Sequence, residues 1–193
     1  MNNLFDIACN FSSDRFDKDL DAVIERAKIN NVNKFLIVSA SLNDFEKTYN
    51  IYKSNLKEAF FSIGTHPHHA DEINEEQIKN MRRLVGEHNP SCIGETGLDF
   101  FRNLSSHDEQ TFAFQEQIKI AIDFNKPLYL HQRDSHSEFM KIISEYKDYL
   151  PKSVVHCFTG TQSELEDYLD LGFYIGLTGW VCDERRNVEL RQS

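Results

Sequence analysis

The feature of this sequence that most limits its fold is a regular alternation of short apolar runs with helical patterns. The apolar runs cover seven ranges, 4–9, 34–40, 59–65, 91–96, 127–132, 153–158 and 173–179. Between them apolar residues recur at helical spacing, as at Phe114, Ile118, Ala121 and Ile122. Strands that are apolar throughout, each followed by a helix, predict a parallel sheet covered by helices.

Seven such units favour a (β/α) barrel over an open sheet. A complete barrel has eight units and typically about 250 residues, whereas this chain has 193. No linker rich in Gly, Pro or Ser and no internal repeat divides the sequence. We therefore predict an α/β protein whose residues 1–193 form a single TIM-type barrel domain that lacks the eighth strand.

Two local signals predict helix ends. Ser135 followed by Glu138 has the spacing of a capping box at the start of the fifth helix. Gly172 follows the sixth helical pattern and is expected to act as its C-terminal cap.

Composition narrows the class of protein. The formal net charge is −10, from 21 basic and 31 acidic residues. Nucleic-acid binding ordinarily needs a basic surface, so any such activity here requires a local site. The four cysteines form no CxxC pair, which predicts reduced thiols rather than a disulfide framework or a zinc ribbon. The sequence shows neither a signal peptide nor a membrane-spanning run, so we expect a cytoplasmic protein with no membrane partner.

Polar residues stand where three successive apolar runs end, the place where barrels of this type form their active sites. Glu95 ends the fourth run, His131 ends the fifth and His156 lies in the sixth. Their separations of 36 (131−95) and 25 (156−131) residues fit successive βα units. One carboxylate and two neutral imidazoles can hold a divalent cation and leave positions open for water and substrate. Two imidazoles favour zinc, manganese or iron over magnesium.

Each of these residues also has an ordinary structural interpretation, as a helix cap, an ion-pair partner or a hydrogen-bonded histidine. Their joint occurrence at consecutive strand ends is what favours a metal site. For His66 and His68, in "THPHHA", a surface loop and a substrate contact both remain open. His136 and His88, near helix ends, are expected to be solvated.

Five stretches, in this order, resemble the TatD family of metal-dependent deoxyribonucleases: "GTHPHHA", "CIGETGLDFFRN", "PLYLHQRDSH", "VVHCFTGT" and "YIGLTGWVCDERR". The resemblance covers essentially all 193 residues and is closest to the bacterial branch. It implies a barrel of the amidohydrolase type. It also implies metal-dependent phosphodiester hydrolysis, as a 3′→5′ exonuclease on DNA, with single-stranded ends as the expected partner, and on RNA in some relatives.

The resemblance also implies roles for individual residues. The family's metal-binding positions correspond to Glu95, His131 and His156. The first histidine of its "HPH" motif corresponds to His66, which we expect near the substrate phosphate and which, with Glu95, is a candidate catalytic residue. His68 and Arg133 are further candidate donors to that phosphate. The family is usually described as magnesium-dependent, so Mg²⁺ stands beside Zn²⁺ and Mn²⁺ as the expected cofactor.

The sequence departs from the family in two places. Many relatives carry a His-x-His metal pair after the first strand, where this chain has Ala8 and Asn10. The family's eighth strand supplies an aspartate that acts as metal ligand or general base, and the sequence contains no counterpart, so we assign no catalytic base. Phe100 and Phe101 could stack a terminal base or pack into the core.

Two other functions remain open at this stage. The same scaffold could carry a hydrolase of amides or lactones, because fold does not fix substrate. The chain could also be a truncated, inactive metal-binding remnant. The oligomeric state is not predicted.

Overall fold

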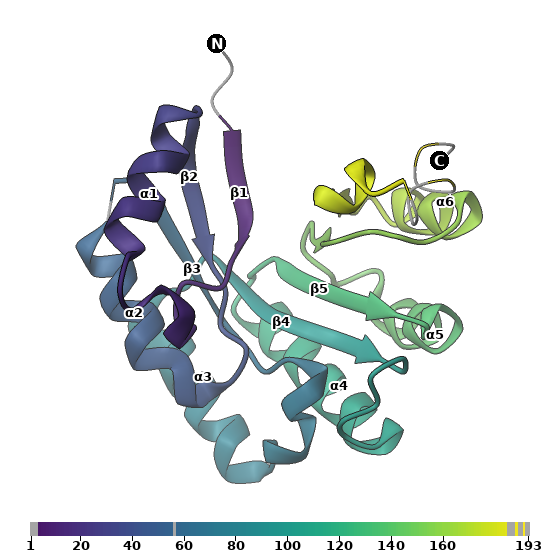
Figure 1. The fold of residues 1–193 in the computed structure, drawn as a ribbon. Coiled ribbons are helices and arrows are strands. Elements are labelled where there is room, and N and C mark those ends of the chain that lie inside the picture. The colour runs from purple at the N-terminus through teal and green to yellow at the C-terminus, as the bar shows by residue number, and fades with distance from the viewer. Residues whose placement is uncertain (1–3, 56, 185–187, 189–190, 192–193) are drawn as a thin grey trace.

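The computed structural model describes residues 4–55, 57–184, 188 and 191. Its sheet has the order β1-β2-β3-β4-β5-β6-β7, with every neighbouring pair parallel. The strands are β1 (Leu4–Cys9), β2 (Val32–Ile37), β3 (Ala59–Ile63), β4 (Cys92–Asp99), β5 (Leu128–Arg133), β6 (Val154–Val155) and β7 (Tyr174–Ile175). Figure 1 shows that the sheet curls, as the wall of an incomplete barrel does. No eighth strand occurs among the described residues.

A helix follows each of the first six strands and lies on the outer side of the curled sheet (Figure 1). The helices are α1 (Leu20–Ile29), α2 (Phe45–Ser54), α3 (Glu75–His88), α4 (His107–Asp123), α5 (His136–Tyr146) and α6 (Gln162–Asp170). A 3₁₀ segment, η3 (Pro67–Glu72), leads from β3 towards α3. The predicted parallel, helix-covered sheet is confirmed.

The prediction of a capping box at Ser135 and Glu138 is wrong. The Ser135 side chain makes no capping hydrogen bond, because its hydroxyl donates to the Leu98 carbonyl at 3.1 Å. Ser106 and Thr161 form the capping boxes instead, at the starts of α4 and α6. Gly172 does follow the end of α6 with φ +72°, as a C-terminal cap requires.

Successive side chains of β5 point to opposite faces of the sheet and so lie in two different environments. Leu128 and Leu130 belong to the large core between the sheet and the helices. Tyr129 packs with Leu36 and Cys92 in a smaller cluster on the other face of the sheet. Because side chains alternate along a strand, His131 lies on the same inner face as Tyr129. This alternation places the polar end of β5 inside the curl.

The last two strands are shorter than the predicted runs 153–158 and 173–179. Backbone hydrogen bonds continue past β6, since the His156 amide donates to the Leu130 carbonyl and the Phe158 amide to Gly176. Cys157 has φ +51°, which is incompatible with extended backbone and ends the regular strand. β4 runs to Asp99, further than the predicted 91–96.

The cysteines are all free thiols, as predicted: Cys9 and Cys92 are buried, Cys157 is partly exposed and Cys182 is exposed. Within the described ranges, none of the helices has the length and apolar character needed to cross a membrane.

Candidate active site

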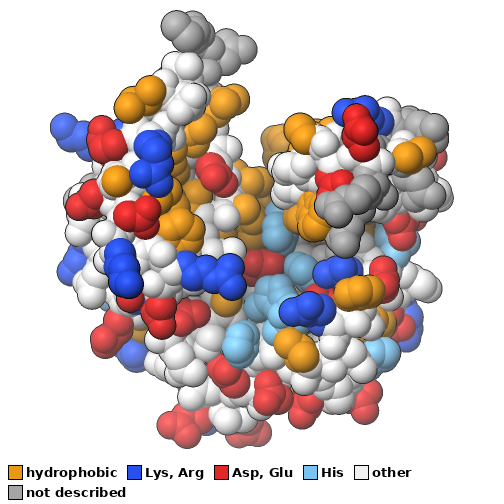
Figure 2. Space-filling view, in the orientation of Figure 1, with side chains coloured by type: hydrophobic (Ala, Val, Ile, Leu, Met, Phe, Trp, Pro, Cys, Tyr) orange, Lys and Arg blue, Asp and Glu red, His pale blue; other side chains and the backbone are white. Residues whose placement is uncertain are grey.

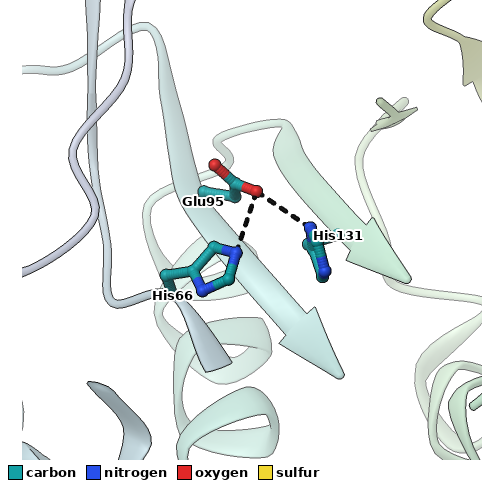
Figure 3. A group of neighbouring side chains, drawn as sticks. All are labelled: His66, Glu95 and His131. Atoms are coloured by element: carbon teal, nitrogen blue, oxygen red, sulfur yellow. Dashed lines mark hydrogen bonds and ion pairs between the residues drawn. The ribbon is translucent and has the colours of Figure 1, made fainter. Parts of the chain in front are cut away.

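The site centres on one carboxylate oxygen of Glu95, a residue of β4 that is only 8% exposed. Glu95 Oε1 lies 2.7 Å from His156 Nε2, 3.0 Å from His131 Nδ1 and 3.2 Å from His66 Nε2. Figure 3 shows Glu95, His66 and His131 pointing towards one another from separate segments of the chain. The structure therefore brings together the three predicted metal ligands and adds His66 to them.

Glycines explain why the Glu95 side chain can approach His131. Gly94 and Gly97 have φ +140° and +141°, values that residues with a side chain rarely adopt. A Cβ atom at Gly94 would overlap the Tyr129 carbonyl, and one at Gly97 would overlap the His131 carbonyl. Only glycine at these two positions lets β4 approach β5 closely enough to form this site.

Glu95 is an ionised carboxylate at neutral pH. Burial by itself would raise its pKa, but attraction to His156 and hydrogen bonds from His131, His156 and His66 outweigh that effect. They hold the pKa of Glu95 well below its ordinary value. A buried negative charge of this kind needs positive charge close to it, as protons or as a cation.

His131 lies between two carboxylates. Its Nδ1 faces Glu95 at 3.0 Å and its Nε2 faces Asp99 Oδ2 at 3.3 Å. Burial disfavours the charged ring, yet the hydrogen bonds to Asp99 and Glu95 raise the pKa of His131 to about 9. Without a metal ion the ring is an imidazolium, whose charge a bound cation would replace.

Asp99 is a component of the site that the sequence analysis missed. It ends β4, is 1% exposed, and its Oδ2 lies 2.7 Å from His68 Nε2. Burial opposes its ionisation, but hydrogen bonds from His131, the Arg102 amide and His68 hold the pKa of Asp99 below its usual range. An acidic residue at the end of an apolar strand was the signal that identified Glu95, and "GETGLD" repeats it four residues later.

The hydrogen bonds of His66 favour it as a donor rather than a metal ligand. Its Nδ1 accepts the His68 backbone amide at 3.0 Å, so the neutral ring carries its proton on Nε2, facing Glu95. Burial lowers the pKa of His66 and keeps the ring neutral. By distance alone, His66, Glu95 and His131 form a group whose ligand atoms all lie within 4.8 Å of one another. The tautomer nevertheless makes His156 the better ligand.

His156 suits a cation for the opposite reason. Its Nε2 lies 2.7 Å from Glu95 Oε1, and its Nδ1 is buried with no hydrogen-bond partner in the described part of the chain, so the ring can carry its proton on Nδ1 without displacing another hydrogen bond. The ring stacks on Tyr129, with centroids 4.6 Å apart, which holds it in place. Nε2 can therefore present a lone pair to a metal ion beside Glu95. One carboxylate with two imidazoles is a donor set that fits a divalent cation.

A cavity of about 850 Å³ opens over these side chains. Figure 2 shows histidines gathered at the base of a hollow, with Lys and Arg side chains beside it. Ala8 and Asn10 also line the cavity and contribute no imidazole to it. Arg15 also lines the cavity and makes no ion pair with any described residue. Arg15 was not among the residues predicted from the sequence.

Two of the predicted substrate contacts lie at the edge of the site. His68 is part of the cavity wall and is held by Asp99. Arg133, the last residue of β5, lies with its guanidinium carbon 3.8 Å from the centre of the Phe101 ring. Phe100 stacks instead on His107, with centroids 3.7 Å apart, and packs against the core. The two phenylalanines therefore have different environments.

The expectation that His136 and His88 are solvated is wrong. His136 lies 3.1 Å from the Tyr168 hydroxyl and 2.8 Å from Asp167, joining α5 to α6. His88 packs against the rings of Phe45 and Tyr49. Both are structural side chains outside the cavity.

A family model and similar proteins of known name point to the same family. A family model described as "TatD related DNase" matches residues 5–193. The chain is 42% identical over 188 residues to a "3′-5′ ssDNA/RNA exonuclease TatD" of Cronobacter sakazakii, covering 97% of this chain and 71% of that protein. A protein of the same name from Pantoea ananatis is 39% identical over 189 residues, covering 98% and 73%. These names do not favour the alternative of an amide or lactone hydrolase.

Solved structures share the fold. A hydrolase described as a TatD family protein from Entamoeba histolytica superposes with a TM-score of 0.84 at 29% identity, over 93% of this chain and 66% of that one. An uncharacterized amidohydrolase from Saccharomyces cerevisiae gives a TM-score of 0.83 at 23% identity, over 92% and 68%. The curled sheet therefore has the architecture of this barrel family.

Proposed function

The chain belongs to the TatD family of related DNases, and we propose that it is a metal-dependent nuclease that removes nucleotides from the 3′ end of single-stranded DNA or RNA. One observation carries the proposal. A buried, ionised carboxylate meets three imidazoles at the base of an open cavity, in a chain about 40% identical to proteins named as such exonucleases.

Glu95, His131 and His156 are the residues that would hold the divalent cation. Bound there, the cation would offset the negative charge of the phosphate and make a bound water more acidic. Asp99 would accept the Nε2 proton of His131 and so orient the ring, as carboxylates behind metal-binding histidines commonly do. Ligand chemistry favours Mn²⁺ or Zn²⁺, and family resemblance favours Mg²⁺.

The remaining polar groups of the cavity would bind the phosphate. His66 carries a proton on Nε2, so it can donate a hydrogen bond to a phosphate oxygen beside Glu95. His68 and Arg15, which line the cavity, and Arg133 beyond its wall would add donors. These groups supply local positive charge in a protein whose net charge is −10, which is how an acidic chain can bind nucleic acid.

Single-stranded oligonucleotides labelled at the 3′ or the 5′ end test the proposal, with Mg²⁺, Mn²⁺ or Zn²⁺ added after chelation. We expect immediate release of a 3′ label, progressive shortening of 5′-labelled strands, and neither in EDTA. His131→Ala and His156→Ala should abolish both the shortening and the metal content measured by elemental analysis. His88→Ala, outside the cavity, serves as the control.

Unchanged metal content in both variants would refute the ligand assignment. Hydrolysis that persists in EDTA would refute the metal-dependent reaction. Metal binding without any hydrolysis of DNA or RNA would favour the inactive remnant, and turnover of a cyclic amide or lactone alone would favour a different hydrolase.

A further inference from the structure

Phe101 and Arg133 form an exposed stacked pair beside the cavity. The Phe101 side chain is 57% exposed, and the Arg133 guanidinium carbon lies 3.8 Å from its ring centre. Arginine covers one face of the ring, and the exposure shows that much of the rest is open to solvent. The neighbouring Phe100, by contrast, is occupied by His107 and the core.

The strand register places this pair next to the candidate metal ligands. Gly97 pairs with His131 and Asp99 with Arg133 across β4 and β5. His131 and Arg133 are two residues apart on β5, so their side chains leave the same face of the strand, roughly 7 Å apart along it. The Phe100 amide donates to the Arg133 carbonyl at 3.0 Å, which fixes the turn that carries Phe101. Arg133 therefore lies two residues beyond His131 on the same face of β5, and Phe101 lies beside it.

No residue that the structure describes accepts a hydrogen bond from the Arg133 side chain. The sequence contains 31 acidic residues, yet Arg133 makes no ion pair with any of those that the structure describes. An arginine held by its flat face on an aromatic ring keeps its N–H groups available at the edge. Planar stacking and phosphate donors are the two features that proteins combine to hold single strands.

We propose that Phe101 and Arg133 form a nucleobase subsite, in which the open face of Phe101 stacks an unpaired base and Arg133 donates to the adjoining phosphate. This rests on the proposed function and deepens it, because it explains a preference for single strands. A base inside a duplex is covered on both faces by its neighbours, whereas an unpaired base offers a face to an aromatic ring. The subsite guides the strand towards the cavity and takes no part in bond cleavage.

Binding measured in EDTA tests the subsite separately from catalysis. The ligands are a fluorescent single-stranded 10-nucleotide DNA and the same DNA with abasic sugars at its last three 3′ positions. Fluorescence anisotropy gives Kd for the wild type, Phe101→Ala, Phe101→Trp and Phe112→Ala. Phe112 is a matched control, because it is 43% exposed on α4.

We expect Phe101→Ala to weaken binding of the intact DNA about 5- to 150-fold, the range that loss of base–aromatic stacking produces. Phe101→Trp should keep wild-type affinity, and Phe112→Ala should have no effect. The abasic DNA should bind the wild type and Phe101→Ala equally. Arg133→Gln should weaken both DNAs and reduce the salt dependence of binding by about one phosphate contact.

Equal loss of affinity for both DNAs in Phe101→Ala would overturn the proposal, because the side chain would then support the fold or the phosphate path rather than a base. Unchanged binding of the intact DNA, or no binding by the wild type, would also overturn it. None of these results depends on hydrolysis, so failure of the subsite is distinguishable from failure of the nuclease assay with labelled strands.

Discussion

Two histidines of this protein look alike in isolation and differ in their surroundings. His131 and His136 each engage both ring nitrogens with oxygen atoms, and they stand five residues apart. The partners of His131 are two buried carboxylates, Glu95 and Asp99, of which Glu95 lines the cavity. Those of His136 are a buried tyrosine hydroxyl and an exposed aspartate.

The difference shows what distinguishes a candidate metal ligand from a histidine that only connects two helices. Two buried carboxylates create a negative charge that, among the described residues, is offset only by histidines, and this charge attracts a cation to the site. The Tyr168 hydroxyl is neutral and the Asp167 carboxylate is exposed to solvent, so neither needs a cation beside it. His136 therefore fastens α5 to α6, whereas His131 can exchange its proton for a metal ion.

The largest effect is expected from replacing each histidine by glutamine. His131→Gln should lower kcat/KM on a 3′-labelled oligonucleotide by more than about 100-fold, since loss of even an outer partner of a metal ligand costs 10- to 100-fold. His136→Gln should leave it within about twofold. Steady-state kinetics in excess metal measures both, and a similar loss in the two variants would remove the distinction between them.

The next largest effect is expected on metal affinity, when the carboxylate beside each histidine is replaced by an amide. Asp99→Asn should weaken metal affinity by about 10- to 100-fold, because the amide holds His131 in place less strongly than the carboxylate does. Asp167→Asn, at His136, should not change it. Competition with a fluorescent chelator gives both affinities. A wild-type affinity in Asp99→Asn would show that Asp99 does not orient the ring.

A pH effect on stability should appear at His131 in chelated protein. Its folded pKa of about 9 lies above the ordinary value of 6.5, so its stabilisation is complete below pH 6.5 and is lost as pH rises through 9. Urea unfolding in EDTA should show wild type losing on the order of 1–3 kcal/mol relative to His131→Gln between pH 6.5 and 9.5. Glu95 and Asp99 remain ionised across this window. Parallel curves for the two proteins would contradict the raised pKa.

The smallest expected effect is on stability, at the contact between His136 and Tyr168. Tyr168→Phe removes the hydroxyl that meets His136 and should lower the free energy of unfolding by about 1 kcal/mol, the ordinary net value of one hydrogen bond. Metal content and hydrolysis should stay unchanged. Chemical denaturation together with elemental analysis checks both parts. A fall in metal content would connect this histidine to the site after all.

Strand periodicity predicted most of this fold, because runs such as 59–65 and 127–132 are apolar enough to require burial on both faces. Local details were less predictable. Ser135 has the spacing of a capping residue, but a carbonyl from β4 is nearer and takes its hydroxyl. Cys157 interrupts its strand through a positive φ that nothing in "VVHCF" indicates.

The sequence was enough to predict which side chains come together in the site, but not how they are hydrogen-bonded. Glu95 lies within β4, His131 within β5 and His156 directly after β6, and neighbouring parallel strands bring the three side chains together. The position of Asp99 between two histidines depends on register, and the tautomer of His66 depends on one backbone amide. Neither is visible in a linear pattern.

The separation of the proposed ligands along the chain has a thermodynamic consequence. Glu95 lies on β4, His131 on β5 and His156 directly after β6, so the denatured polypeptide offers no preformed chelate. An ion that binds only the native form raises the melting temperature in proportion to the logarithm of its concentration above Kd. The cofactor would then act as a folding ligand, and its supply would set how much of this protein survives heating.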